Sequence, residues 1–181
     1  YTIGDIDGNA NLIIEAVRRA EAEGADLVLF AEYAVSGTPA YDLLRKTTFL
    51  TLCEEALERI AEACHHVTAI VGSPILTENG AVSAAAVLRQ GRIDEIIEKQ
   101  HISARREMGF IVSGEGSKVV RIGGCNIAVY VGNDMTNVNE VDSDVDFVVN
   151  INARRYGKGL LSYRYDWMRR LTYTLGRNVI L

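Results

Sequence analysis

Three residues that bear on acyl-transfer chemistry each stand where an apolar run of the sequence ends. Glu32 follows "DLVLFA", Lys99 follows "IDEIIE" and Gly132 follows "IAVYV". The ends of such strands can converge on one pocket in a parallel or mixed sheet. A carboxylate and an ammonium brought together there are partly desolvated, so their pKa values shift and they can act as base and acid. A nucleophile beside them would complete an acyl-transfer site, but Gly132 has no side chain.

One other interpretation of Glu32 and Lys99 stays open. On spacing alone, Glu32 and Lys99 could be solvated residues at strand edges. The cysteines offer no substitute nucleophile. Cys125 stands seven residues before Gly132, which is about 20 Å along an extended strand. Cys53 and Cys64 lie on a predicted helix and are more simply core residues. Three cysteines without CxxC spacing indicate free thiols in a reducing compartment, so we expect a cytoplasmic protein.

The elements that must position these residues alternate between helix and strand. Apolar residues at helical spacing predict helices over 9–24, 48–64 and 159–175. In the last of these helices, one helical stripe consists of Leu161, Arg164, Met168, Leu171 and Leu175. Unbroken apolar runs predict buried strands over 25–32, 67–74 and 145–152, and a further strand from 177. Turn residues predict hairpins at Gln90-Gly91, within 83–100, and at Gly123-Gly124, within 118–132.

This order of elements predicts the fold class. Pure strand–helix alternation would predict a doubly wound sheet. The two hairpins instead favour an α/β fold of the α-β-β-α sandwich type, in which two mixed sheets lie between helical layers. Only two prolines occur, without a low-complexity linker, so we expect residues 1–181 to form a single domain. The chain begins just before a helix and ends in a strand, so we expect this domain to be incomplete at both ends.

Several motifs resemble the nitrilase superfamily in their order and context. They are "GDIDGN", "DLVLFAEYAVSGTPAYDLL", "IIEKQH", "IAVYVGNDM" and "VDFVVNINARRYGKG". The segment "GTPAYDLL" is similar to "GYPPxDLL", and "SAAAVL" to "NAAxxL", in the glutamine-hydrolysing domain of glutamine-dependent NAD synthetases. Each motif alone is weak, but together they cover essentially the whole chain.

The resemblance implies a Glu-Lys-Cys site that hydrolyses glutamine and supplies ammonia. Glu32 matches the general base, and Lys99 matches the residue that stabilises the oxyanion with help from a backbone N–H, here that of Asn133. Gly132 stands at the position of the family's cysteine, so we expect impaired chemistry. A second glutamate of the family falls near Glu107, with the register off by one.

Departures from the family pattern keep a second hypothesis open. "ISAR" replaces "LPxY" after the lysine, and "NARRY" replaces "SASPF", which places Arg154 and Arg155 near the expected pocket as candidate substrate-binding residues. The chain is then either an impaired glutamine amidase domain or a non-catalytic member of the fold, acting as a scaffold or as a binder of a small carboxylate. A Rossmann-like module is disfavoured because no GxGxxG opens a helix after a first strand.

Partners and cofactors follow from charge and from the resemblance. A net charge of −5 and the absence of a long apolar run argue against nucleic acid and membrane as partners. We expect a small amide or carboxylate ligand, glutamine by resemblance, and no cofactor in this domain. The resemblance also implies a homo-oligomer and a synthetase domain on the same full-length chain. Trp167 suits core or dimer packing, and His65-His66 lacks the second ligand pair of a metal site.

Overall fold

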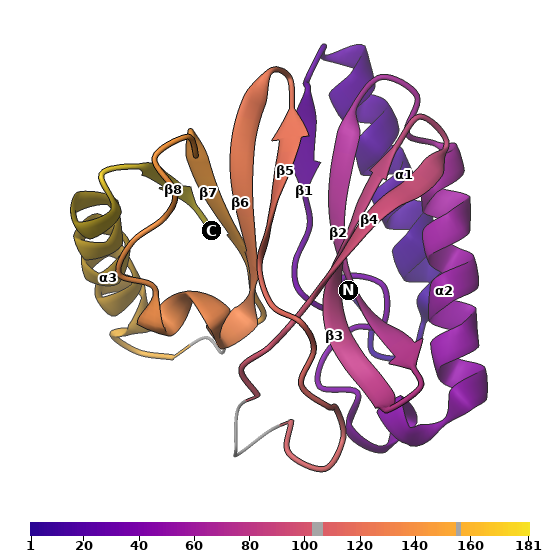
Figure 1. The fold of residues 1–181 in the computed structure, drawn as a ribbon. Coiled ribbons are helices and arrows are strands. Elements are labelled where there is room, and N and C mark those ends of the chain that lie inside the picture. The colour runs from indigo at the N-terminus through magenta and orange to yellow at the C-terminus, as the bar shows by residue number, and fades with distance from the viewer. Residues whose placement is uncertain (103–106, 155–156) are drawn as a thin grey trace.

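The computed structural model describes residues 1–102, 107–154 and 157–181. Helices and strands alternate along the chain, as the sequence predicts (Figure 1). The longer helices are α1 (Ile6–Ala22), α2 (Thr47–Glu62) and α3 (Leu160–Leu175), and the 3₁₀ helices are η1 (Tyr41–Arg45) and η2 (Gly132–Asn137). The strands are β1 (Leu27–Leu29), β2 (Thr68–Thr77), β3 (Gly80–Arg89), β4 (Arg92–Glu98), β5 (Lys118–Ile122), β6 (Cys125–Val131), β7 (Phe147–Ile151) and β8 (Asn178–Ile180).

The strands form two mixed sheets. The first has the order β1-β2-β3-β4, with β1 parallel to β2 and the other neighbours antiparallel. The second has the order β5-β6-β7-β8, with β5 antiparallel to β6 and the other neighbours parallel. Both predicted hairpins are confirmed, joining β3 to β4 and β5 to β6. At the first, Gln90 and Gly91 both have positive φ, as a two-residue hairpin turn of type I′ requires.

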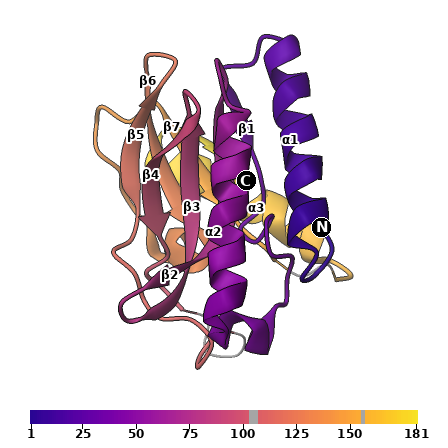
Figure 2. The ribbon, with the colours of Figure 1, turned by 90° about the vertical axis from the view of Figure 1, so that its right-hand side faces the viewer.

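The sheets stack face to face between helical layers, which confirms the predicted α-β-β-α sandwich. Helices α1 and α2 cover the outer face of the first sheet and α3 covers that of the second (Figures 1 and 2). Apolar side chains of both sheets fill the space between them, among them Ile70, Val87, Ile97, Val129 and Val149. This central layer fixes the strands whose ends carry the candidate site.

The inward face of α3 differs from the predicted stripe. The buried residues are Trp167, Leu171 and Leu175, whereas Leu161 is 58% exposed. The C-terminal half of α3 packs on the second sheet, and Leu160 and Arg164 of its first half line a cavity instead. Trp167 lies in the core, one of the two environments that the sequence suggested. Among the described residues, no helix is both long and apolar enough to cross a bilayer.

Candidate active site

The three strand ends singled out in the sequence meet at one cavity of about 660 Å³. Glu32 lies three residues after β1, Lys99 directly follows β4, and Gly132 directly follows β6. The 152–154 segment after β7 closes a further side of the cavity. The residues that line it are Glu32, Lys99, His101, Glu107, Gly132, Asn133, Thr136, Asn152, Ala153, Arg154, Leu160, Tyr163 and Arg164.

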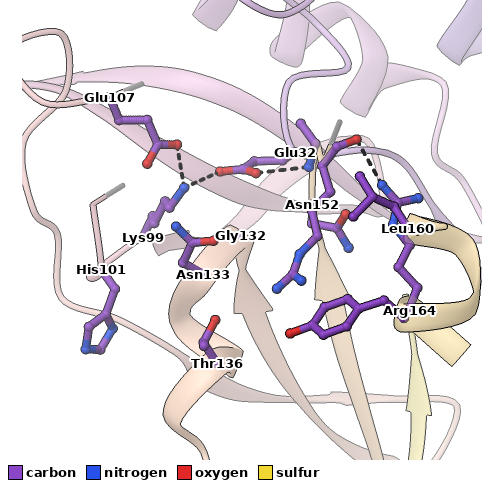
Figure 3. A pocket seen from close by; sticks show the side chains of 13 residues that line it. Glu32, Lys99, His101, Glu107, Gly132, Asn133, Thr136, Asn152, Leu160 and Arg164 are labelled. Atoms are coloured by element: carbon purple, nitrogen blue, oxygen red, sulfur yellow. Dashed lines mark hydrogen bonds and ion pairs between the residues drawn. The ribbon is translucent and has the colours of Figure 1, made fainter. Parts of the chain in front are cut away.

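Lys99 lies between two carboxylates at the base of this cavity (Figure 3). Its Nζ is 2.7 Å from Oε1 of Glu32 and 2.5 Å from Oε1 of Glu107. The side chains of Lys99, Glu32 and Glu107 are 2%, 5% and 12% exposed, respectively. We call Glu32, Lys99 and Glu107 the lysine cluster. The predicted proximity of Glu32 and Lys99 is therefore observed, and the solvated strand-edge interpretation of these two residues is wrong.

Glu32 is held from two further directions. Ser83 Oγ donates to its Oε1 at 3.2 Å, and the backbone N–H of Ala153 donates to its Oε2 at 3.1 Å. Burial raises the pKa of the Glu32 carboxyl, and the neighbouring Glu107 adds to that rise, although the Lys99 ammonium opposes it. A raised carboxyl pKa suits a group that must take up a proton near neutral pH.

Lys99 remains charged in this surrounding. Burial disfavours the ammonium, but the negative charge of Glu32 and the hydrogen bonds to Glu107 and Glu32 outweigh burial and raise the pKa of Lys99. With both carboxylates ionised and one ammonium, the lysine cluster has a net charge of −1. Burial, and then the negative charges of Glu32 and Glu107, raise the pKa of Tyr33. The hydroxyl of Tyr33 donates a hydrogen bond to Glu107 at 3.2 Å.

Gly132 faces the lysine cluster directly. Its φ is +56°, a left-handed conformation that residues with a side chain adopt at a cost. A Cβ atom built on Gly132 would lie 2.6 Å from Lys99 Nζ and 2.7 Å from Glu32 Oε1. A side chain at this position would therefore touch both the acid–base pair and the cavity, and Lys99 and Glu32 now occupy the space it would need.

Two polar residues that the sequence did not single out as site residues hold the turn at Gly132. The Asp134 carboxylate accepts the backbone N–H groups of Gln100 at 2.9 Å and His101 at 2.6 Å, and so ties the turn to the residues that follow Lys99. From β7, the Asn150 amide donates to the carbonyl oxygen of Gly132 at 3.2 Å.

The cysteines lie away from the lysine cluster, as expected. Cys53 and Cys64 are buried in the core beneath the first sheet. Burial raises the pKa of Cys53 to about 12 and that of Cys64 to about 11, so neither provides a thiolate at neutral pH. Cys125 starts β6, at the opposite end of that strand from Gly132. Within the described part of the chain, no three His, Cys, Asp or Glu residues group as a metal site.

The two arginines expected near the pocket have different outcomes. Arg154 lines the cavity, and its guanidinium carbon lies 4.3 Å from the centre of the Trp167 ring. Arg155 lies outside the described residues. Asn133 lines the cavity beside Gly132, where its backbone was expected to contribute an N–H. The catalytic and binding roles of all these residues remain predictions.

Comparison with known sequences gives one consistent group of relatives. The chain is 34% identical over 170 residues to the glutamine-dependent NAD(+) synthetase of Xanthomonas campestris pv. campestris (strain 8004), covering 88% of this chain and 31% of that protein. It is 30% identical over 183 residues to the enzyme of the same name from Thermotoga maritima, covering 95% of this chain and 32% of that protein. The chain thus spans about a third of the length of these relatives. No protein-family model matches it.

Comparison with solved structures agrees. A glutamine-dependent NAD+ synthetase from Acinetobacter baumannii, in complex with ADP, superposes with a TM-score of 0.87 at 25% identity, over 98% of this chain and 35% of that chain. A cysteine-to-serine mutant of the Nesterenkonia AN1 amidase from the nitrilase superfamily gives a TM-score of 0.77 at 18% identity, over 98% of this chain and 71% of that chain. The second likeness shows a common fold.

Proposed function

We propose that this chain, a member of the nitrilase superfamily, is a carbon–nitrogen hydrolase domain whose cavity is built to hydrolyse the side-chain amide of glutamine. The observation that carries the proposal is the buried lysine cluster facing Gly132. A base, an ammonium and the position of a nucleophile converge there on one cavity. As the sequence stands, we expect the covalent route to be absent, because Gly132 offers no thiol.

The proposed roles follow from this arrangement. With a cysteine at position 132, Glu32 would take the thiol proton and the thiolate would attack the amide carbon. Lys99 and the Asn133 N–H would stabilise the oxyanion, and the proton would pass to the departing ammonia. Water would then hydrolyse the thioester. Glu107 would keep Lys99 charged and in place.

In the present chain, water must attack the amide directly. Glu32 would deprotonate that water, and the same donors would stabilise the oxyanion. Electrostatic stabilisation can leave residual catalysis when a nucleophile is missing. Turnover of this kind should be slow and should pass through no acyl-enzyme.

The second candidate function is binding without turnover. The arginine that lines the cavity favours a small carboxylate as the ligand, and the loss of the nucleophile removes the covalent step. In this case the lysine cluster would contribute polar contacts to a bound molecule. A synthetase domain on the same full-length chain remains a proposal that rests on the relatives, and assembly into a homo-oligomer remains one that rests on the family resemblance alone.

Restoring the nucleophile distinguishes the two candidates. We expect Gly132→Cys to release ammonia from glutamine, detected by a coupled assay, and the unmodified chain to release far less. Lys99 and Glu32 must shift to admit the new Cβ, which their flexible ends allow. Gly132→Ser is the matched control, because it adds similar bulk without a thiol. A folded Gly132→Cys variant that releases no ammonia would refute the amidase proposal and favour the binding function.

A further inference from the structure

Arg154 stands where the main cavity meets two smaller ones. It lines the cavity of about 660 Å³ and also the neighbouring cavities of about 260 Å³ and 290 Å³. It is the second residue of "ARRY", which replaces the family's usual small and apolar residues. An arginine at this junction places a permanent positive charge beside the lysine cluster.

Both the side chain and the backbone of Arg154 are held in place by neighbouring residues. The guanidinium lies over the ring of Trp167, which is itself packed in the core between α3 and the second sheet. Arg164 Nη2 donates to the carbonyl oxygen of Arg154 at 3.0 Å, and the N–H of the preceding Ala153 donates to Glu32. Because the guanidinium is already ordered on a buried indole, a ligand that binds it loses little free energy to the ordering of this side chain.

The charge of Arg154 is not neutralised by the described part of the protein. No carboxylate oxygen of the described residues lies within 4.0 Å of its guanidinium nitrogens. The carboxylate of Glu32, which is close in space, is already bound by Lys99 and by the Ala153 N–H. A partly buried guanidinium of this kind gains most from an anion brought by a ligand.

We propose that Arg154, stacked on Trp167, binds the carboxylate of the ligand that occupies the main cavity. The ligand is then a short molecule with a carboxylate at one end and an amide at the other, and the amide lies at the lysine cluster. The proposal rests on the proposed function only for the amide end. Trp167 is a positioning residue, because it acts through Arg154.

Trp167 also provides the measurement, since it is the chain's only tryptophan. Its fluorescence can be followed while glutaramate, which has one carboxylate and one amide, is added to the unmodified chain. Pentanediamide, in which a second amide replaces the carboxylate, is the neutral isostere. We expect glutaramate to change the emission saturably and to bind at least about tenfold more tightly than pentanediamide, since a hydrogen bond to a charged group is lost in the isostere.

Variants then assign the preference to one residue. Arg154→Gln should abolish the preference for glutaramate, whereas Arg154→Lys should keep part of it, because lysine retains the charge without the planar fork. Arg169→Gln, at an exposed arginine of α3 paired with Asp166, is the matched control and should keep the full preference. Trp167→Phe, followed by calorimetry, should reduce the preference for glutaramate without reversing it.

Each result decides for or against the subsite. Equal binding of the two ligands, no saturable response to glutaramate, or an Arg154→Gln variant that keeps the preference would overturn it. If the preference holds while Gly132→Cys releases no ammonia, the subsite stands and the amidase proposal fails. If Gly132→Cys hydrolyses glutaramate and pentanediamide equally well, the amidase proposal stands and the subsite fails.

Discussion

Replacing Lys99 by methionine would remove the only cation of the lysine cluster while keeping a side chain of similar length. Two charged hydrogen bonds would be lost, at 2.7 Å to Glu32 and at 2.5 Å to Glu107. Each such bond contributes about 1.5–3 kcal/mol, and removing one partner of a buried ion pair costs about 3–5 kcal/mol. We therefore expect Lys99→Met to lower the free energy of unfolding by about 3–5 kcal/mol.

Lys118→Met is the matched control for this change. Lys118 also contacts two carboxylates, those of Glu95 at 2.7 Å and Glu115 at 3.8 Å, but its side chain is 37% exposed. Exposed pairs contribute about 0–1 kcal/mol. Urea unfolding should therefore move the midpoint by about 2 M for Lys99→Met, for a slope of about 2 kcal/mol per molar, and much less for Lys118→Met.

The pH dependence gives an independent check. Burial raises the pKa of Glu32 above its ordinary value of 4.5, so the folded chain holds this proton more tightly than the unfolded chain does. Stability therefore falls as pH rises from 4.5 through the raised value. Lys99→Met removes the ammonium that stabilises the ionised form of Glu32. The loss of stability in this variant should therefore be small at about pH 4, where Glu32 holds its proton, and full at about pH 8, where the carboxylate is buried without a cation. Equal losses for Lys99→Met and Lys118→Met at the higher pH would refute this reasoning.

Three further predictions concern the turn and the thiols. Gly132→Ala should destabilise the chain more than Gly24→Ala, because both positions have positive φ but only the Cβ at Gly132 meets other atoms; urea unfolding of the two variants measures the difference. Asp134→Ala should cost about 2–4 kcal/mol in the same assay, since two backbone N–H groups lose a charged acceptor. In the folded chain, a thiol reagent should modify Cys125, which is partly exposed, and leave both buried cysteines unmodified until the chain is unfolded.

Local signals account for the parts of the fold that the sequence predicted well. The hairpin at Gln90-Gly91 depends on two adjacent residues that tolerate positive φ, so a dipeptide is enough to indicate it. Strand ends at Glu32, Lys99 and Gly132 were visible because apolar runs stop at them. The strands of each sheet follow one another in chain order, but the parallel pairs β1-β2, β6-β7 and β7-β8 join strands separated by intervening segments, and apolar runs do not specify such partners.

Contacts to backbone groups explain much of what the sequence did not indicate about the site. Asp134 holds the N–H groups of Gln100 and His101, and every residue except proline has such a group, so no residue type marks the partner. The stripe predicted for α3 failed at Leu161, which is exposed because only the C-terminal half of that helix packs on the second sheet. Helical spacing shows which residues share a face but not what lies opposite that face.

Whether the lysine cluster activates a nucleophile at position 132 is tested most directly by the intact mass of Gly132→Cys after incubation with an electrophilic glutamine analogue that alkylates active-site thiols. We expect one covalent adduct on this variant that peptide mapping places at position 132. Labelling of Cys125, which is partly exposed, is common to both chains and is separated by the same mapping. No cavity residue of the unmodified chain should be labelled, and the reaction at position 132 should be much slower when Glu32→Gln is added to Gly132→Cys. An adduct on a cavity residue of the unmodified chain, or equal labelling of position 132 in Gly132→Cys with and without Glu32, would show that the lysine cluster does not activate a nucleophile at this position.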